Sequence, residues 1–150
     1  WYTQVAEPKS KKQYNIALRY SPKEVLNVTV AGSGLDKKYI NASNLFLTFD
    51  PNATNMNYVA LGAAESALIF HTVMQLDINK SCMRNETETC YKLPIVTCQT
   101  SKELVLELHD ASPTALVYDK NCIKVQGEKE ELMRAVDRLL YEWLGIIRVK

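Results

Sequence analysis

Four cysteines in the second half of the chain place the strongest constraint on its fold: Cys82, Cys90, Cys98 and Cys122. An even number of cysteines agrees with folding in an oxidising compartment, and four cysteines allow three pairings. Cys82 and Cys90 bracket a polar loop that can close on itself, which leaves Cys98 and Cys122 to join two strands. We therefore favour the pairs Cys82–Cys90 and Cys98–Cys122. By chain entropy each bridge would stabilise the fold by about 2–4 kcal/mol.

A metal site is the competing interpretation of these cysteines. Structural zinc sites are commonly built from closely spaced cysteine pairs, and the chain contains no Cys-X-X-Cys sequence. Only His71 and His109 are present to complete a ligand set. Haem attachment through Cys-X-X-Cys-His is excluded for the same reason. We expect no metal and no cofactor other than N-linked glycans.

Five Asn-X-Ser/Thr sequons indicate a glycoprotein, and their acceptors are Asn27, Asn41, Asn52, Asn79 and Asn85. The chain has 10 Asn and 18 Ser or Thr residues, so random placement would produce only about one sequon. Because a glycan is bulky and polar, each occupied asparagine must lie at the surface. Asn52, Asn79 and Asn85 lie among turn-forming residues, which suits this requirement. Asn27 and Asn41 lie in or beside predicted strands and would have to point outward.

The overall composition is that of an ordinary globular domain. Of the 150 residues 47% are hydrophobic and 23% are charged, and the formal net charge of +1 gives no general attraction to nucleic acid or anionic membranes. The longest apolar run covers residues 58–76 and approaches membrane-spanning length. It contains Glu65, His71 and Gln75, which are costly in hydrocarbon. We therefore expect a helix buried in a protein core and no membrane span.

Alternating and periodic apolar residues predict the order of the elements. Strands are predicted over residues 13–20, 25–31 and 45–49, a helix over 58–76, a charged cysteine loop over 80–92, and strands over 94–98, 103–108, 115–118 and 122–126. Residues 1–12 are expected to be an N-terminal lead-in, and residues 13–150 a single extracellular domain. The predicted class is α+β: a mostly antiparallel or mixed sheet with two helices packed against it, stapled by disulfides.

The last helix carries the clearest periodicity. After Gly127, acidic residues 128, 130 and 131 favour a helix N-terminus. Its apolar stripe consists of Leu132, Ala135, Val136, Leu139, Leu140 and Trp143, and Arg134, Asp137, Arg138 and Glu142 lie mainly on the other face. Gly145 is expected to end the helix, and residues 146–149 can resume as a strand.

This C-terminal segment resembles a known pattern. It reads Asn121-Cys122-Ile123-Lys124-Val125-Gln126-Gly127, then Ala135, Asp137-Arg138-Leu139-Leu140 and Leu144-Gly145-Ile146. The segment covers about 30 residues and resembles the strand-glycine-helix tail of archaeal surface-layer and related secreted envelope proteins. The resemblance implies an extracellular coat or envelope protein that has no catalytic residues and can assemble with itself, as a lattice component, an accessory protein or a filament subunit.

No catalytic motif competes with this interpretation. The chain lacks a Gly-X-Gly-X-X-Gly loop, a phosphate-binding loop and a Gly-X-Ser-X-Gly elbow. His109 and Asp110 with Ser101 or Ser112 make a poor triad, because adjacent side chains on an extended segment point apart. Candidate carboxylates for glycoside chemistry, which include Asp36, Asp50 and Glu107, cannot be ranked from the sequence. We expect no enzyme activity.

The leading hypothesis is a secreted, glycosylated structural or interaction protein at the cell surface. Its expected partners are copies of itself or other envelope proteins, through terminal segments 1–8 and 146–150 that could pair with a neighbour's sheet edge. An extracellular ligand-binding or sensor domain of a longer membrane protein is the alternative. A secreted hydrolase is the third hypothesis, disfavoured because no set of residues supplies an activated nucleophile.

Overall fold

The computed structural model describes residues 1–7, 10–85 and 87–147. Its strands are β1 (Tyr2–Ala6), β2 (Gln13–Ala17), β3 (Thr29–Leu35), β4 (Asn44–Phe49), β5 (Asp77–Cys82), β6 (Val105–Asp110), β7 (Ala115–Lys120) and β8 (Cys122–Gly127). Its helices are α1 (Met56–Thr72) and α2 (Glu130–Trp143), with short 3-10 helices η1 (Lys23–Val25), η2 (Lys37–Tyr39) and η3 (Glu88–Cys90). The predicted α+β class, a single disulfide-stapled domain with a mixed sheet and two helices, is confirmed.

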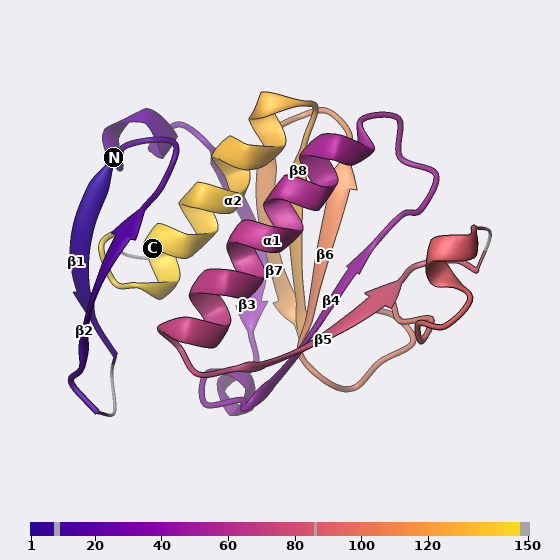
Figure 1. The fold of residues 1–150 in the computed structure, drawn as a ribbon, viewed down its shortest axis with the longest axis horizontal. Helices are drawn as coiled ribbons and strands as arrows, with labels where there is room; N and C mark the ends of the chain where they lie inside the picture. The colour runs from indigo at the N-terminus through magenta and orange to yellow at the C-terminus, as the bar shows by residue number, and fades with distance from the viewer. Residues whose placement is uncertain (8–9, 86, 148–150) are drawn as a thin grey trace.

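The main sheet has six strands in the order β3-β7-β8-β6-β4-β5 (Figure 1). Four of its pairs are parallel, and only β7 and β8 run antiparallel. Leu47, Leu106 and Ile123 occupy neighbouring positions on three adjacent strands and are all buried. Both helices pack on one face of this sheet (Figure 1), as expected where parallel strands are joined by helical crossovers such as α1 between β4 and β5.

Helix α2 is covered on two sides. Its predicted apolar stripe is buried against the sheet, except that Trp143 is half-buried and packs edge-on against Phe70 at 5.2 Å between ring centroids. The opposite side meets the N-terminal segment: Arg138 Nη1 donates to Val25 O at 3.1 Å, and the Tyr141 hydroxyl donates to Tyr20 O.

The face of α2 that the sequence predicts to be polar is not exposed to solvent as expected. Asp137 and Glu142 were expected to lie mainly opposite the apolar stripe, yet both are buried. Glu142 is satisfied by Arg138 Nε at 2.6 Å and by the Tyr118 hydroxyl at 3.2 Å. The outer face is therefore polar but not solvated, because the N-terminal segment packs on it.

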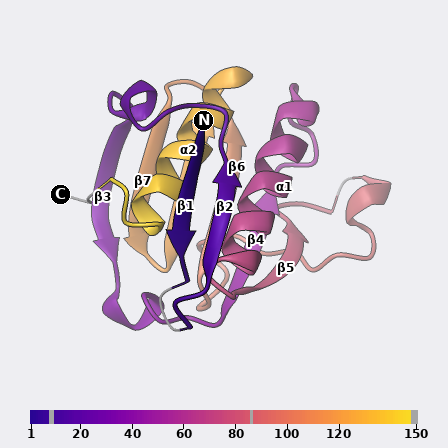
Figure 2. The same cartoon turned by 60° about the vertical axis from the view of Figure 1, so that its left-hand side comes forward.

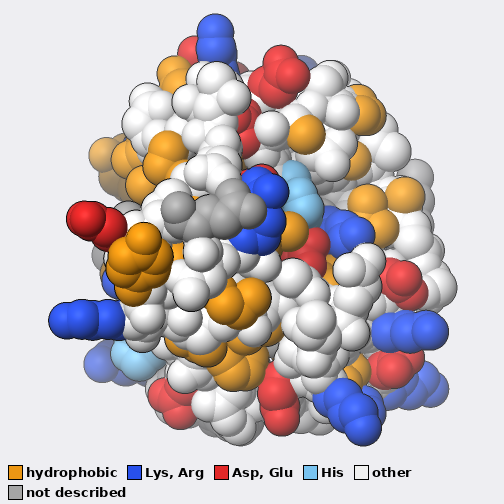
Figure 3. Space-filling view, turned by 90° about the vertical axis from the view of Figure 1, so that its right-hand side faces the viewer, with side chains coloured by type: hydrophobic (Ala, Val, Ile, Leu, Met, Phe, Trp, Pro, Cys, Tyr) orange, Lys and Arg blue, Asp and Glu red, His pale blue; other side chains and the backbone are white. Residues whose placement is uncertain are grey.

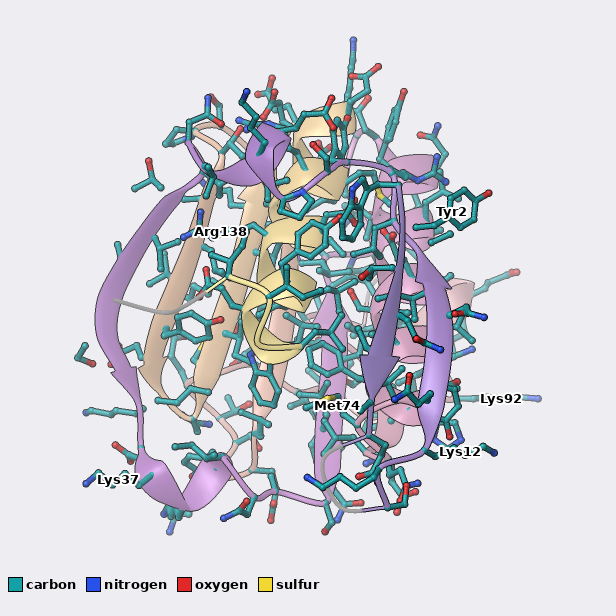
Figure 4. All side chains as sticks on the ribbon, turned by 90° about the vertical axis from the view of Figure 1, so that its left-hand side faces the viewer. Tyr2, Lys12, Lys37, Met74, Lys92 and Arg138 are labelled. Atoms are coloured by element: carbon teal, nitrogen blue, oxygen red, sulfur yellow. A yellow bond between two sulfur atoms is a disulfide. The ribbon has the colours of Figure 1, made fainter. Side chains whose placement is uncertain are left out.

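The expected N-terminal lead-in contains a strand. β1 pairs antiparallel with β2, from Tyr2 opposite Ala17 to Ala6 opposite Gln13. Figure 2 shows this hairpin in front of α2, on the helix side of the molecule. Trp1 packs edge-on against Tyr141 at 5.4 Å between ring centroids, while Tyr2 points into solvent (Figure 4). The hairpin is thus part of the packed structure.

Several predicted boundaries differ from the structure. The helix expected over 58–76 ends at Thr72, because Gln75 takes a left-handed conformation (φ 57°). Strand β5 (Asp77–Cys82) was not expected, and its last residues replace the start of the loop predicted over 80–92. The strand expected over 94–98 is only one bridge, between Ile95 and Cys82. The strand over 25–31 is divided between η1 and β3.

The C-terminal strand expected over 146–149 does not form at Ile146 and Ile147, and residues 148–150 lie outside the described part. Within the described residues, no helix has the length and apolar character needed to cross a bilayer.

Gly127 allows β8 to turn tightly into α2, and this generates a test. A Cβ atom at Gly127 would lie 2.4 Å from the carbonyl carbon of Glu131 and 2.5 Å from Leu132 N. We predict that Gly127→Ala destabilises the protein by about 1–3 kcal/mol, measured by urea unfolding, because backbone atoms must move. Gly34→Ala is the control, since a Cβ there meets no atom within 4 Å and only its positive φ opposes the change. Equal losses in the two variants would contradict this role of Gly127.

Candidate functional site

Both disulfides involve the long connection between β5 and β6. Cys82 is bonded to Cys90 and Cys98 to Cys122, the two pairs favoured from the sequence, and no described cysteine is free. The first closes the lobe of residues 83–93, and the second joins the connection to the start of β8. Cys82 also exchanges backbone hydrogen bonds with Pro94 O and Val96 N at 3.1 and 2.9 Å.

The five sequon asparagines all reach the surface. Asn27, Asn41, Asn52 and Asn85 are exposed, and Asn79 is half-buried. The surroundings of three positions differ from the sequence interpretation: Asn27 and Asn41 lie in turns, whereas Asn79 lies in the edge strand β5. Because β5 has a neighbour on one side only, its side chains can remain accessible. None of the acceptors lies on α1, α2 or the β1–β2 hairpin.

An apolar cavity of about 530 Å³ lies between α1, the β4–β5 edge and the disulfide lobe. Its apolar lining includes Leu47, Phe49, Met56, Val59, Ala63 and Leu93. Two polar residues, Lys80 and Thr87, also line it. Figure 3 looks onto this side of the molecule, where hydrophobic side chains are visible between charged ones. The volume falls within the range of about 300–1,000 Å³ that is usual for small-molecule pockets.

The cavity exists because α1 is apolar all around while the sheet covers only one of its faces. Outward-facing Leu61 and Leu68 are exposed, and four alanines, Ala60, Ala63, Ala64 and Ala67, line the cavity. Alanine side chains are too short to reach the lobe, so space remains between them. Sequence periodicity predicts a buried helix here, but it carries no signal for a cavity beside that helix.

A pair of carboxyl groups lies where α1, α2 and the segment after β2 meet. Burial, the neighbouring Asp137 charge and a hydrogen bond with Asp137 raise the pKa of Glu65 to about 9. Burial likewise raises the pKa of Asp137, whose Oδ2 accepts from Tyr20 N at 2.9 Å. The two groups therefore share a proton at neutral pH. Asp137 is fully buried, whereas Glu65 is half-buried and lines a second pocket together with Arg19 and Leu68.

A second polar cluster lies on the sheet face away from the helices. Glu107 Oε1 lies 2.7 Å from His109 Nε2, and Glu107 Oε2 accepts from Cys98 N at 2.7 Å. Burial alone would raise the pKa of Glu107, but the hydrogen bonds from His109 and Cys98 hold it below its ordinary value. Ligand atoms of Cys98, Glu107 and Cys122 lie within 4.8 Å of one another. Because the two sulfurs are bonded to each other, no thiolate is available to a metal while that disulfide is closed.

The residues considered for catalysis are engaged elsewhere. Asp110 accepts hydrogen bonds from Asn55 N and Nδ2 at 2.8 and 3.1 Å, so it does not orient His109. Asp50 pairs with Arg84 at 2.6 Å. Exposed His71 places Nδ1 3.0 Å from Leu76 O, at the end of α1. Asp36 precedes η2 and makes no side-chain cap. Of the candidate residues, Glu107 and His109 therefore lie in contact, whereas Asp110, Asp50 and His71 are held by other partners.

The shared proton of Glu65 and Asp137 predicts an alkaline loss of stability. The folded pKa of Glu65 is about 9, above its ordinary value of 4.5, so the folded state binds more protons between these values. Its contribution is fully present below about pH 4.5 and is lost as the pH rises toward 9. We predict that Glu65→Gln, which removes this titration, melts about 2–4 °C above the wild type at pH 8, the change that about 1 kcal/mol produces at this chain length. Identical melting-temperature profiles from pH 5 to 9 would contradict the shared proton.

The two disulfides are expected to contribute unequally. Their sequence separations are 8 and 24 residues, so loop-closure entropy gives about 2.6 kcal/mol for Cys82–Cys90 and about 3.5 kcal/mol for Cys98–Cys122. We predict that replacing both cysteines of a pair by alanine lowers the free energy of unfolding more for Cys98–Cys122. Urea titrations of the two double variants measure the difference. A larger loss from the shorter loop would show that contacts around the lobe, rather than loop length, dominate.

Comparison with known proteins supplies no family. No family model, no curated protein and no solved structure matches the chain. The resemblance of the C-terminal segment to surface-layer tails accordingly stays a prediction from the sequence, and the function has to be inferred from the chain's own geometry.

Proposed function

We propose that this chain is a secreted, glycosylated domain of the cell surface that acts as a structural or interaction protein. The observation that supports this most directly is that five sequon asparagines reach the surface of a fold closed by two disulfides. Sugar on asparagine and paired thiols are both acquired outside the reducing cytosol. The resemblance of residues 121–150 to archaeal envelope proteins adds the expectation of a coat or filament role.

Self-association would use the side of the molecule without sequons. Leu61 and Leu68 on the outer side of α1 are 42% and 64% exposed. The only acidic residue of α1 is Glu65, which is protonated at neutral pH, so this surface can be desolvated at low electrostatic cost. The N-terminal residues expected to pair with a neighbour's sheet already pair with β2 along one edge of β1, which leaves that strand a single open edge.

The cavity supports a second candidate function. An extracellular ligand-binding or sensor domain of a longer membrane protein would need a preformed apolar space with few polar groups, and the cavity beside α1 has this character. Nothing in the arrangement of carboxylates, histidines and hydroxyl groups favours a hydrolase over these two candidates.

Glycosylation is tested on protein purified from its native source. We predict an intact mass above the polypeptide value of 17.0 kDa that falls on enzymatic or chemical deglycosylation. Replacing each acceptor asparagine by glutamine should lower the native mass by one glycan where the site is used. A native mass equal to that of the bare polypeptide would remove the proposed cell-surface glycoprotein.

Self-association is tested by sedimentation velocity over a range of concentrations. We predict that Leu68→Glu weakens association by at least tenfold, because it puts a charge into an apolar contact. Leu26→Glu is the matched control, since Leu26 is 60% exposed but lies beside the Asn27 sequon. A wild-type protein that stays monomeric at high concentration, or equal effects of both variants, would exclude α1 as the contact.

A further inference from the structure

We propose that the cavity beside α1 binds a single-chain amphiphile with an anionic head group. The apolar chain would lie along the alanine side of α1, and the head group would contact Lys80 and Thr87. This inference rests on the ligand-binding candidate and not on glycosylation or self-association, so each can fail without the other.

The walls of the cavity suit an alkyl chain. The floor is made by Leu47 and Phe49 of β4, and the α1 side by alanines one and two turns apart, such as Ala60, Ala63 and Ala67. These side chains carry no polar atom that an alkyl chain would leave unpaired. A linear apolar chain is therefore a better fit than a polar ligand.

The charge at the rim selects the head group. Of the residues in the described part of the chain that line the cavity, Lys80 is the only charged one. It follows Ile78 on the helix-facing side of the edge strand β5, opposite Leu47 of β4, and forms no ion pair with any described residue. Among the described residues that line the cavity there is no carboxylate to oppose an anion or attract a cation. Charge complementarity thus favours an anionic head group.

Thr87 supplies a second polar contact. Its Oγ1 is buried and has no hydrogen-bond partner in the described part of the chain. Buried hydroxyl groups are normally paired, and this one belongs to the cavity wall. The Thr87 hydroxyl could donate a hydrogen bond to a carboxylate oxygen of a ligand that also contacts the Lys80 ammonium group.

The Cys82–Cys90 disulfide places this contact. Cys82 ends β5, two residues after Lys80, and Cys90 follows Thr87 by three residues, with Cys90 N donating to Thr87 O at 3.0 Å. The bridge therefore ties the lobe segment that carries Thr87 to the end of the edge strand that carries Lys80. A site fixed in this way loses little conformational freedom when a ligand binds.

The test is calorimetric titration of the full chain with hexanoate, octanoate and decanoate. We expect affinity to increase about fourfold for each added methylene until the cavity is full. Decanol and decyltrimethylammonium have the same chain with a neutral or cationic head, and both should bind at least tenfold more weakly than decanoate. Absence of decanoate binding, no dependence on chain length, or equal affinity for the cationic probe would overturn the inference.

Variants separate the head-group contact from the chain contact. Lys80→Gln should weaken decanoate binding by at least tenfold and leave decanol binding unchanged. Thr87→Val should also weaken decanoate binding and spare decanol binding; because it removes the Asn85 sequon as well, it is compared with wild-type protein that carries no glycans. Lys102→Gln, an exposed lysine that does not line the cavity, should change neither. Ala60→Phe fills the cavity from an exposed position of α1 and should abolish binding of both probes. Unchanged decanoate binding in Lys80→Gln, or in Ala60→Phe, would place the ligand elsewhere and exclude this site.

Discussion

Two disulfides attach the long connection between β5 and β6 to the sheet, and the structure at the β5 edge depends on them. Residues 83–104 join β5 to β6, and their described part, which leaves out residue 86, contains the three-residue η3 as its only regular structure. Irregular connections of this length rarely hold one conformation without further support. Here one disulfide closes the first part of the connection on the end of β5, and the other joins its later part to β8. A disulfide lowers the conformational entropy of the unfolded chain, so less entropy is lost when the connection is ordered on folding. An irregular segment can therefore still form two walls of the molecule.

The connection packs on both faces of the sheet: the lobe lies on the helix side and the segment after Pro94 lies on the other side. On the helix side the closed lobe faces α1 across a space that four alanines leave open, and the cavity results. On the other side the segment after Pro94 crosses the sheet, where the Thr48 hydroxyl donates to Val96 O at 2.8 Å and Glu107 accepts from Cys98 N. Glu107 and His109 can look like catalytic residues, yet their hydrogen bonds hold this segment in place. The same bonds explain why Glu107 stays ionised although it is buried.

Elements with a strong periodic signal could be predicted from the sequence, and elements defined by their neighbours could not. The stripe of α2, the strands β4, β6, β7 and β8, and the two cysteine pairs follow from local pattern and loop length. β5 has the polar sequence Asp77-Ile78-Asn79-Lys80-Ser81-Cys82 and forms a strand because β4 offers it an open edge. Asp137 is contacted by Tyr20 of the segment after β2, more than 100 residues away in sequence. The cavity, the Glu65–Asp137 pair and the Cys98–Glu107 contact are likewise spatial, and no spacing in the sequence encodes them.

Disulfide mapping of protein from its native source tests the account most directly. Free thiols are alkylated before digestion under non-reducing conditions, and linked peptides are identified by mass spectrometry. The account predicts no alkylated cysteine, and linked peptides that join only Cys82 to Cys90 and Cys98 to Cys122. Links that join Cys82 or Cys90 to Cys98 or Cys122 would contradict the attachment of the connection described here, and alkylated cysteines in the native protein would contradict maturation in an oxidising compartment as well.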